Sequence, residues 1–296
     1  MPRFALLILA LSSFLLLSAQ ARAQAFDQAP AHAAQRVITL TPHATELACA
    51  AGLCDQLIAV SEYSDYPKQV KRLEKVANYQ GIKLERILTL QPDLVIAWSE
   101  GSSSRELNQL RQLGIPIYLS SIHSLEDIAR NIDELSQYSA DPTQGDAVAE
   151  QFRQQLSTLQ QQYANATPIR YFYQLSEQPL ITLAQSSWPS EVFRLCGGEN
   201  IVEHSRVPYP QVSIEQVILA KPDIIFTTDD QPPSQRWQAW ANQLPAAQPQ
   251  QIKPLTADWL NRPTPRTLNA ITEVCHSFDQ VRQNLRSGAS KSLTAQ

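Results

Sequence analysis

The chain has 296 residues, of which 43% are hydrophobic and 18% charged, and its formal net charge is −4. This length suits one large or two medium domains, and the acidic balance argues against nucleic acid as a partner. The sequence contains no G-x-S-x-G, no P-loop and no G-x-G-x-x-G after a strand, so common hydrolase and nucleotide-binding enzyme classes are not indicated.

The N-terminus has the features of a secretory signal peptide. Arg3 precedes an apolar run at 4–17, and the small-residue site Ala21-Arg22-Ala23 follows it. The run is shorter than the roughly 18 residues of a membrane span, and no cysteine near the site is placed to accept a lipid. We therefore expect cleavage after residue 23 and an exported protein that is not embedded in a membrane.

Short apolar runs alternate with helical patterns along the rest of the chain. The expected strands are 36–40, 57–60, 94–97, 115–119, 169–173 and 224–226, and the expected helices among them are 44–48, 104–113 and 188–195. This alternation predicts an α/β fold with right-handed crossovers. The pattern occurs twice, which predicts two Rossmann-like lobes with mainly parallel sheets, at 36–140 and 168–285.

A single long helix is predicted between the lobes, within the linking segment 141–167. Asp141 is a suitable N-cap with Pro142 at the first helical position, and apolar residues recur on one face up to Tyr163. About 22 helical residues span roughly 33 Å, so we expect a rigid strut. The Ser-, Ala- and Lys-rich segment 286–296 is predicted to be a disordered tail.

One stretch occurs twice: LERILTLQPDLVIA at 84–97 and IEQVILAKPDIIFT at 214–227. The copies share a glutamate (Glu85 and Glu215), and each has a Pro-Asp pair before an apolar run. Ser213 and Gln216 form a capping-box pattern, and the proline is expected to end the short helix.

Four cysteines follow the signal peptide, and three pairings are possible. Cys49 and Cys54 have a spacing that fits no standard zinc site, so structural disulfides are the expected use.

These segments together identify a resemblance to the periplasmic cobalamin (vitamin B12)-binding proteins of ATP-driven importers, a class in which one helix joins two lobes. The matching stretches are RVITLTP (36–42), TEL (45–47), YSDYP (63–67), LERI (84–87), PDLVIAW (92–98), CGGEN (196–200), SRVP (205–208), PQVS (210–213) and DW (258–259). The resemblance extends over about 36–280. It implies a monomeric carrier in the periplasm that passes cobalamin to an inner-membrane permease dimer with its ATPase subunits.

The resemblance also assigns roles to residues. The ligand is expected in a cleft between the lobes, without a resident cofactor or metal and without enzymatic chemistry. The implied ligand-binding residues are Tyr63, Tyr79, Trp98, Tyr209, Asp258, Trp259, Leu260, Asn261 and Arg262. Glu85 and Glu215 are implied to dock on arginines of the permease, and Cys196 and Cys275 to form a disulfide. Cys49 and Cys54 have no counterpart in the resemblance, and their pairing stays open.

Three alternatives remain at this point. A Zn²⁺ or Mn²⁺ receptor of the same architecture would use His43, His123, His204 and Asp258. A siderophore or haem receptor would also use an aromatic cleft. An enzyme is the weakest alternative, because its only suggestive pair, His43 and Glu46, is interpreted as an exposed pair on one helix face.

Overall fold

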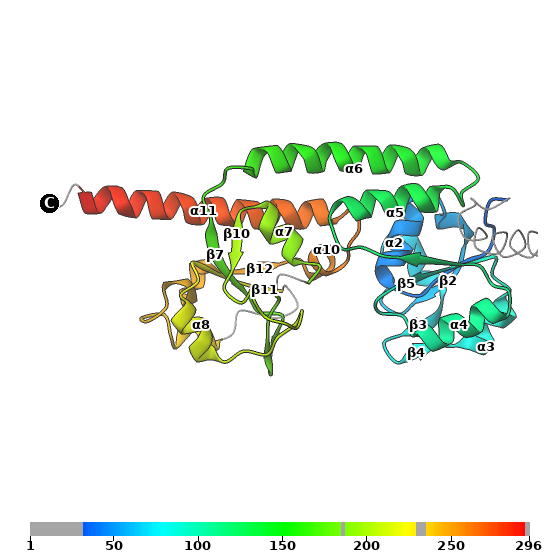
Figure 1. Cartoon of the computed structure of the whole chain (residues 1–296), viewed down its shortest axis with the longest axis horizontal. Helices are drawn as coiled ribbons and strands as arrows, with labels where there is room; N and C mark the ends of the chain where they lie inside the picture. Colours follow the sequence, from blue (N-terminus) through cyan, green and yellow to red (C-terminus); the bar gives the residue numbers. More distant parts are fainter. Residues whose placement is uncertain (1–31, 185–186, 229–234, 294–296) are drawn as a thin grey trace, which may run out of the picture.

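The computed structural model describes residues 32–184, 187–228 and 235–293, which form two α/β lobes connected by one long helix (Figure 1). The signal peptide predicted at 1–23 lies outside the described residues. Among the described helices, none is long and apolar enough to cross a membrane.

The first lobe is built on a six-stranded sheet with the order β4-β3-β2-β1-β5-β6. All neighbouring strands are parallel except β3 and β4. Strand β1 is wholly buried and β5 almost so, as the continuous apolar sequence of β5 requires. The strands are β1 Val37–Thr39, β2 Leu57–Ser61, β3 Glu74–Asn78, β4 Gly81–Ile82, β5 Leu94–Trp98 and β6 Ile117–Ser120. The helices are α2 Pro42–Ala50, α3 Leu84–Leu90, α4 Ser104–Gln112 and α5 Glu126–Ser136, with 3₁₀ turns at Cys54–Gln56 and Lys68–Arg72.

The second lobe has a four-stranded parallel sheet with the order β10-β7-β11-β12. Its strands are β7 Ile169–Tyr173, β10 Gly198–Asn200, β11 Ile224–Thr228 and β12 Ile252–Leu255, beside a small hairpin of β8 Ser176–Glu177 and β9 Leu180–Ile181. Its helices are α7 Ser190–Leu195, α8 Ile214–Ala220, α9 Gln235–Gln238, α10 Ala257–Asn261 and α11 Thr267–Leu293, with 3₁₀ turns at Pro245–Ala247 and Pro249–Gln251.

The two lobes repeat one topology. The parallel strands β2-β1-β5-β6 of the first lobe have the same order as β10-β7-β11-β12 of the second. In both, the strand after the Pro-Asp pair lies beside the first strand of its lobe: Leu94 pairs with Val37, and Ile224 pairs with Tyr171. The α/β fold with mainly parallel sheets in two lobes is therefore confirmed.

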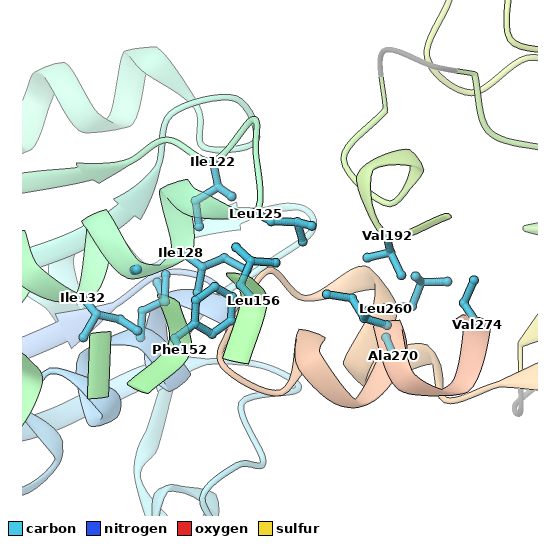
Figure 2. Close-up of a cluster of buried hydrophobic side chains, with 14 of the residues drawn as sticks. Ile122, Leu125, Ile128, Ile132, Phe152, Leu156, Val192, Leu260, Ala270 and Val274 are labelled. Atoms are coloured by element: carbon cyan, nitrogen blue, oxygen red, sulfur yellow. The ribbon is translucent and has the colours of Figure 1, made fainter. Parts of the chain in front are cut away.

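Helix α6, Pro142–Tyr163, links the lobes and begins at the predicted cap, where the Asp141 carboxylate accepts the Thr143 backbone N–H at 3.1 Å. Phe152 and Leu156 are buried in a hydrophobic cluster that contains residues of both lobes. Figure 2 shows part of this cluster, with α5 and α6 residues on one side and Leu260, Ala270 and Val274 on the other. The linking helix is thus packed along its length against both lobes.

Gly145 permits a close approach at the start of α6. A Cβ at this position would lie 2.5 Å from the Ser136 Cβ and 3.1 Å from the Ala51 Cα. The glycine therefore allows α6 to lie directly against the ends of α2 and α5, and it does not provide a hinge.

The C-terminal segment differs from the prediction. Helix α11 continues through Leu293, beyond the boundary set at residue 286, and projects past the second lobe (Figure 1). Ala, Lys and Leu are good helix formers, and they extend a helix that is already nucleated by packing.

Candidate functional site

Three of the residues predicted to bind ligand line one pocket in the first lobe. Tyr63 follows β2, Tyr79 follows β3, and Trp98 is the last residue of β5, so all three lie at the carboxyl ends of parallel strands. The pocket has a volume of about 460 Å³. Sites of α/β sheets commonly lie at this edge, because the loops that follow parallel strands meet there.

The Trp98 indole is held by its local backbone. The Trp98 backbone N–H donates to the Ser102 Oγ at 3.1 Å, and a Cβ at Gly101 would lie 2.0 Å from the Trp98 Cε3 atom. The ring therefore lies against the backbone of Gly101, where only glycine leaves room. On another side, the His43 ring meets the Trp98 ring edge to face at a centroid distance of 5.5 Å.

The two tyrosines present large exposed rings to the pocket. Tyr63 is 72% exposed and Tyr79 is 87% exposed, although aromatic side chains usually bury most of their surface. Tyr63 has a φ of 63°, a left-handed conformation that costs a residue with a Cβ roughly 1–3 kcal/mol. The fold thus tolerates an unfavourable backbone conformation at a residue whose ring points to the pocket side.

Tyr209 comes from the second lobe and faces the first. Burial raises the pKa of Tyr209, and the nearby carboxylate of Glu100, which follows β5 of the first lobe, raises it further. Glu100 also contacts His123, with 3.0 Å between its Oε1 atom and the imidazole Nδ1 atom. Tyr209 is not among the residues that line the first-lobe pocket, and its connection to the first lobe is the charge of Glu100.

The segment 258–262, which was predicted to bind ligand, forms most of the short helix α10. Some of its side chains are buried and others are polar and at least partly exposed. Leu260 is fully buried in the hydrophobic cluster that the two lobes share, Trp259 packs against the same cluster, and the Leu260 carbonyl accepts the Trp188 Nε1–H at 3.1 Å. The Leu260 side chain therefore has no surface with which to contact a ligand. Asn261 is exposed, and Asp258 and Arg262 form an ion pair at 2.7 Å.

Arg262 and Arg266 of the second lobe form ion pairs with the first lobe. The Arg262 Nη1 atom is 2.7 Å from the Asp65 Oδ1 atom and 3.3 Å from the Glu46 Oε1 atom, and the Arg266 Nε donates to the Glu46 Oε2 at 2.8 Å. Burial alone would raise the pKa of Asp65, but the Arg262 guanidinium outweighs this effect and lowers it. Sequence reasoning missed Glu46, Asp65 and Arg266 as members of this group.

The interpretation of His43 and Glu46 as an exposed helix pair is wrong. Both residues are buried, His43 at 7% exposure and Glu46 at 4%. Their helix α2 carries them into the space between the lobes, and the partners of Glu46 are more than 200 positions away in the sequence. The stretch TEL around Glu46 was the only available signal, and it carried no information on burial.

His43 makes stability dependent on pH. Burial, with a smaller effect of the Arg262 charge, lowers the pKa of His43 from 6.5 to about 4. Between these values the unfolded chain binds more protons than the folded one, so the free energy of unfolding falls as the pH falls. From pH 7 to pH 4 we expect a loss of about 3 kcal/mol from this residue.

Urea unfolding at several pH values measures this effect. The variant His43→Leu has a similar volume and no titrating group, and it also removes a buried Nε2 atom that has no hydrogen-bond partner among the described residues. Its stability should change less between pH 7 and pH 4 than that of the unaltered chain. Equal pH dependence of stability in the two proteins would contradict the lowered pKa of His43.

The histidines proposed for a metal site do not assemble one. No group of three or more His, Cys, Asp or Glu residues in the described part of the chain is arranged to hold a metal ion. His204 is 91% exposed by its side chain, His123 is paired with Glu100, and His43 lies against Trp98.

The duplicated stretch has the same structure in both lobes. Helices α3 and α8 end at Gln91 and Lys221, which have φ values of 46° and 49°. The Asp93 carboxylate then accepts the Arg36 backbone N–H at 2.9 Å, and Asp223 accepts that of Arg170 at 2.9 Å. The shared aspartates therefore have a structural role, which is to fix the neighbouring strand.

The shared glutamates have no comparable role. Glu85 and Glu215 are exposed in the first turns of their helices, and neither is in an ion pair with another described residue. The predicted capping box is present at Ser213 and Gln216; the backbone N–H of Glu215 and the Ser213 hydroxyl lower the pKa of Glu215. Helices α3 and α8 both lie on the side of their lobe away from α6 (Figure 1).

Both cysteine pairs form disulfides. Cys196 is joined to Cys275 across 79 residues within the second lobe, and Cys49 is joined to Cys54. The sequence left the pairing of Cys49 and Cys54 open, and the structure shows that they are bonded to each other.

The chain belongs to the periplasmic binding protein family, which it matches over residues 37–255. A relative from Vibrio parahaemolyticus serotype O3:K6, named vitamin B12-binding protein, is 57% identical over 254 residues, which are 84% of this chain and 91% of the relative. A protein of the same name from Vibrio cholerae serotype O1 (strain ATCC 39541) is 59% identical over 243 residues, covering 82% of this chain and 88% of the relative.

Solved structures show the same fold. The crystal structure of the periplasmic vitamin B12-binding protein BtuF of Vibrio cholerae matches with a TM-score of 0.79 and 57% identity, over 84% of this chain and 98% of that chain. The periplasmic haem-binding protein RhuT from Roseiflexus sp. RS-1 matches with a TM-score of 0.74 at 21% identity, over 83% of this chain and 98% of that chain. At 21% identity, the similarity to the haem-binding protein shows only that the fold is shared.

Proposed function

We propose that this chain captures vitamin B12 in the cleft between its lobes and delivers it to an ATP-driven importer in the inner membrane. The observation that carries the proposal is the identity of 57–59% to proteins named vitamin B12-binding protein, over 82–84% of the chain. The aromatic pocket supports it, because exposed rings suit the broad apolar face of a corrin.

Each group of site residues has a defined task in this proposal. Tyr63, Tyr79 and Trp98 form an aromatic wall on the first lobe, and Tyr209 closes the cleft from the second. Asp258, Asn261 and Arg262, with the backbone of α10 and the edge of Trp259, provide polar groups for the amides and the nucleotide tail. The ligand is carried unchanged, by a monomer without a resident cofactor.

Export and docking complete the proposal. The signal peptide at 1–23 directs the chain to the periplasm, where it meets the importer. Glu85 and Glu215 then pair with arginines on the two permease subunits. The matched positions of α3 and α8 support this role, because a two-lobed carrier on a two-subunit permease needs one anchor in each lobe.

Calorimetric titration of the mature protein with cyanocobalamin tests the proposed ligand. We expect one-to-one binding with a dissociation constant of about 1 μM or below, about −8 kcal/mol. Absence of binding, together with binding of haem or of a ferric siderophore, would contradict the proposal.

A glycine variant tests the pocket itself. Gly101→Ala displaces the Trp98 ring and is expected to weaken binding by about tenfold, since misplaced contacts at a binding site cost roughly 1–2 kcal/mol. The control is Gly114→Ala. Gly114 has a positive φ, of 80°, but a Cβ added there would have nothing within 4 Å and the residue lies outside the pocket, so the control strains the backbone without touching Trp98. Equal losses of affinity in the two variants would exclude a specific role of Trp98.

A further inference from the structure

A buried carboxylate joins the two lobes. The Glu46 side chain is 2% exposed and lies on α2 of the first lobe, whereas its partners Arg262 and Arg266 lie in the second lobe at the end of α10 and just before α11. The Arg266 guanidinium binds both carboxylate oxygens: its Nε donates to the Oε2 at 2.8 Å and its Nη2 to the Oε1. Arg262 adds a longer contact of 3.3 Å to the Oε1. Glu46 is therefore held by two cations, both from the opposite lobe.

The two arginines are held from several sides. Arg262 also binds Asp65 of the first lobe and Asp258 of the second, each at 2.7 Å. The Arg266 guanidinium carbon lies 4.3 Å from the centre of the Tyr66 ring, again in the first lobe. The arginine side chains are only 15% and 16% exposed. This segment of the second lobe is consequently fixed against the first lobe by the shielded pairs with Glu46 and by the more exposed pair with Asp65.

Among the residues that form ion pairs between the lobes, Glu46 matters most because it is buried. An ion pair at the surface contributes little, and the Asp65 side chain is 43% exposed. A buried carboxylate that loses its partners leaves an uncompensated charge, which is strongly unfavourable. Burial alone would lower the pKa of Arg266, but the hydrogen bonds that Arg266 donates to the Glu46 carboxylate, and the charge of that carboxylate, outweigh burial and raise the pKa. Separating the lobes at this point would break both arginine contacts of Glu46 at once.

We propose that Glu46 is a positioning residue of the cleft: through Arg266 and Arg262 it sets the spacing of the two lobes and orients Asp258 toward the ligand. Asp258 touches Arg262 and thus depends on the same anchor. The effect on affinity rests on the proposed function, whereas the effect on lobe spacing does not.

Hydrogen exchange of the full mature chain, with Glu46→Gln, tests the spacing. Glutamine keeps the size of the side chain and removes its charge. We expect backbone exchange to rise at least about fivefold in residues 62–67 and 257–267, because the open state of this contact becomes more populated, and the radius of gyration in solution scattering to increase. Arg266→Lys, which keeps the charge but loses the two-point contact, should produce a smaller change in the same segments. The control is Glu74→Gln, which removes an exposed Arg–Glu pair within the first lobe and should leave both segments unchanged.

Cyanocobalamin titration of the same variants tests the consequence for binding. Glu46→Gln should weaken affinity about tenfold, and Glu74→Gln should not. Unchanged exchange in Glu46→Gln would overturn the proposal, and so would faster exchange with unchanged affinity, because Glu46 would then hold the lobes without serving the cleft. If the unaltered chain binds no cyanocobalamin, the proposed ligand is wrong, and the exchange comparison alone decides whether Glu46 sets the spacing.

Discussion

A chain that carries both Glu85→Arg and Glu215→Arg is expected to bind vitamin B12 with unchanged affinity and to support no uptake. Both glutamates are exposed and lie outside the first-lobe pocket, so ligand contacts should survive. At the proposed permease contacts, each reversal would replace a charge pair by a repulsive contact. Truncating one partner of such a pair costs about 2–5 kcal/mol, so two reversals should reduce docking by more than about 100-fold.

Uptake by cells or by vesicles that contain the importer measures this effect, beside a titration of the purified variant. The control is Glu150→Arg with Glu199→Arg, which changes the net charge equally at two other exposed glutamates, one on α6 and one in the second lobe. The control should transport normally. Loss of affinity in the Glu85 and Glu215 variant, or uptake equal to that of the control, would contradict the docking role.

Removal of the disulfide between Cys196 and Cys275 should have the largest effect on stability. Both cysteines are buried, at 0% and 1% exposure, and the bond closes a loop of 79 residues between α7 and α11. In the chain-entropy description, a loop of this length corresponds to about 4 kcal/mol of stability. Cys196→Ala with Cys275→Ala should lose about this amount, measured by urea unfolding.

The other disulfide provides the matched comparison. Cys49 and Cys54 are only 5 positions apart, so Cys49→Ala with Cys54→Ala should cost about 2 kcal/mol. Equal losses from the two pairs, or a larger loss from the short loop, would contradict the expected dependence on loop length.

The fold could be predicted largely because its signals are local. The strands β5 and β11 are continuous apolar runs, and α6 has an N-cap, a proline and one apolar face in the sequence itself. Strands β3, β4, β10 and β12 of the two main sheets were missed, and so was the hairpin of β8 and β9. Strand β3 begins with charged residues, and β10 has only three residues, Gly198–Asn200, without an apolar pattern.

The site was less predictable because its key contacts join distant segments. The aromatic residues Tyr63, Tyr79 and Trp98 share a pocket as the strand order requires. The burial of Glu46 depends instead on Arg262 and Arg266, which reach it only when the two lobes are packed together. Leu260 illustrates the same limit, since the segment around it is mostly polar while its side chain is fully buried.

The hydrophobic cluster around α6 has a consequence for how the molecule unfolds. Phe152 and Leu156 belong to the same cluster as Ile128 of the first lobe and Val274 of the second (Figure 2). Each lobe also has a smaller cluster of its own, but this larger cluster is shared between them. A lobe produced alone would expose the apolar surface that its counterpart and α6 normally cover, and would tend to aggregate. The chain should accordingly melt in a single cooperative transition, and its halves are not interchangeable modules.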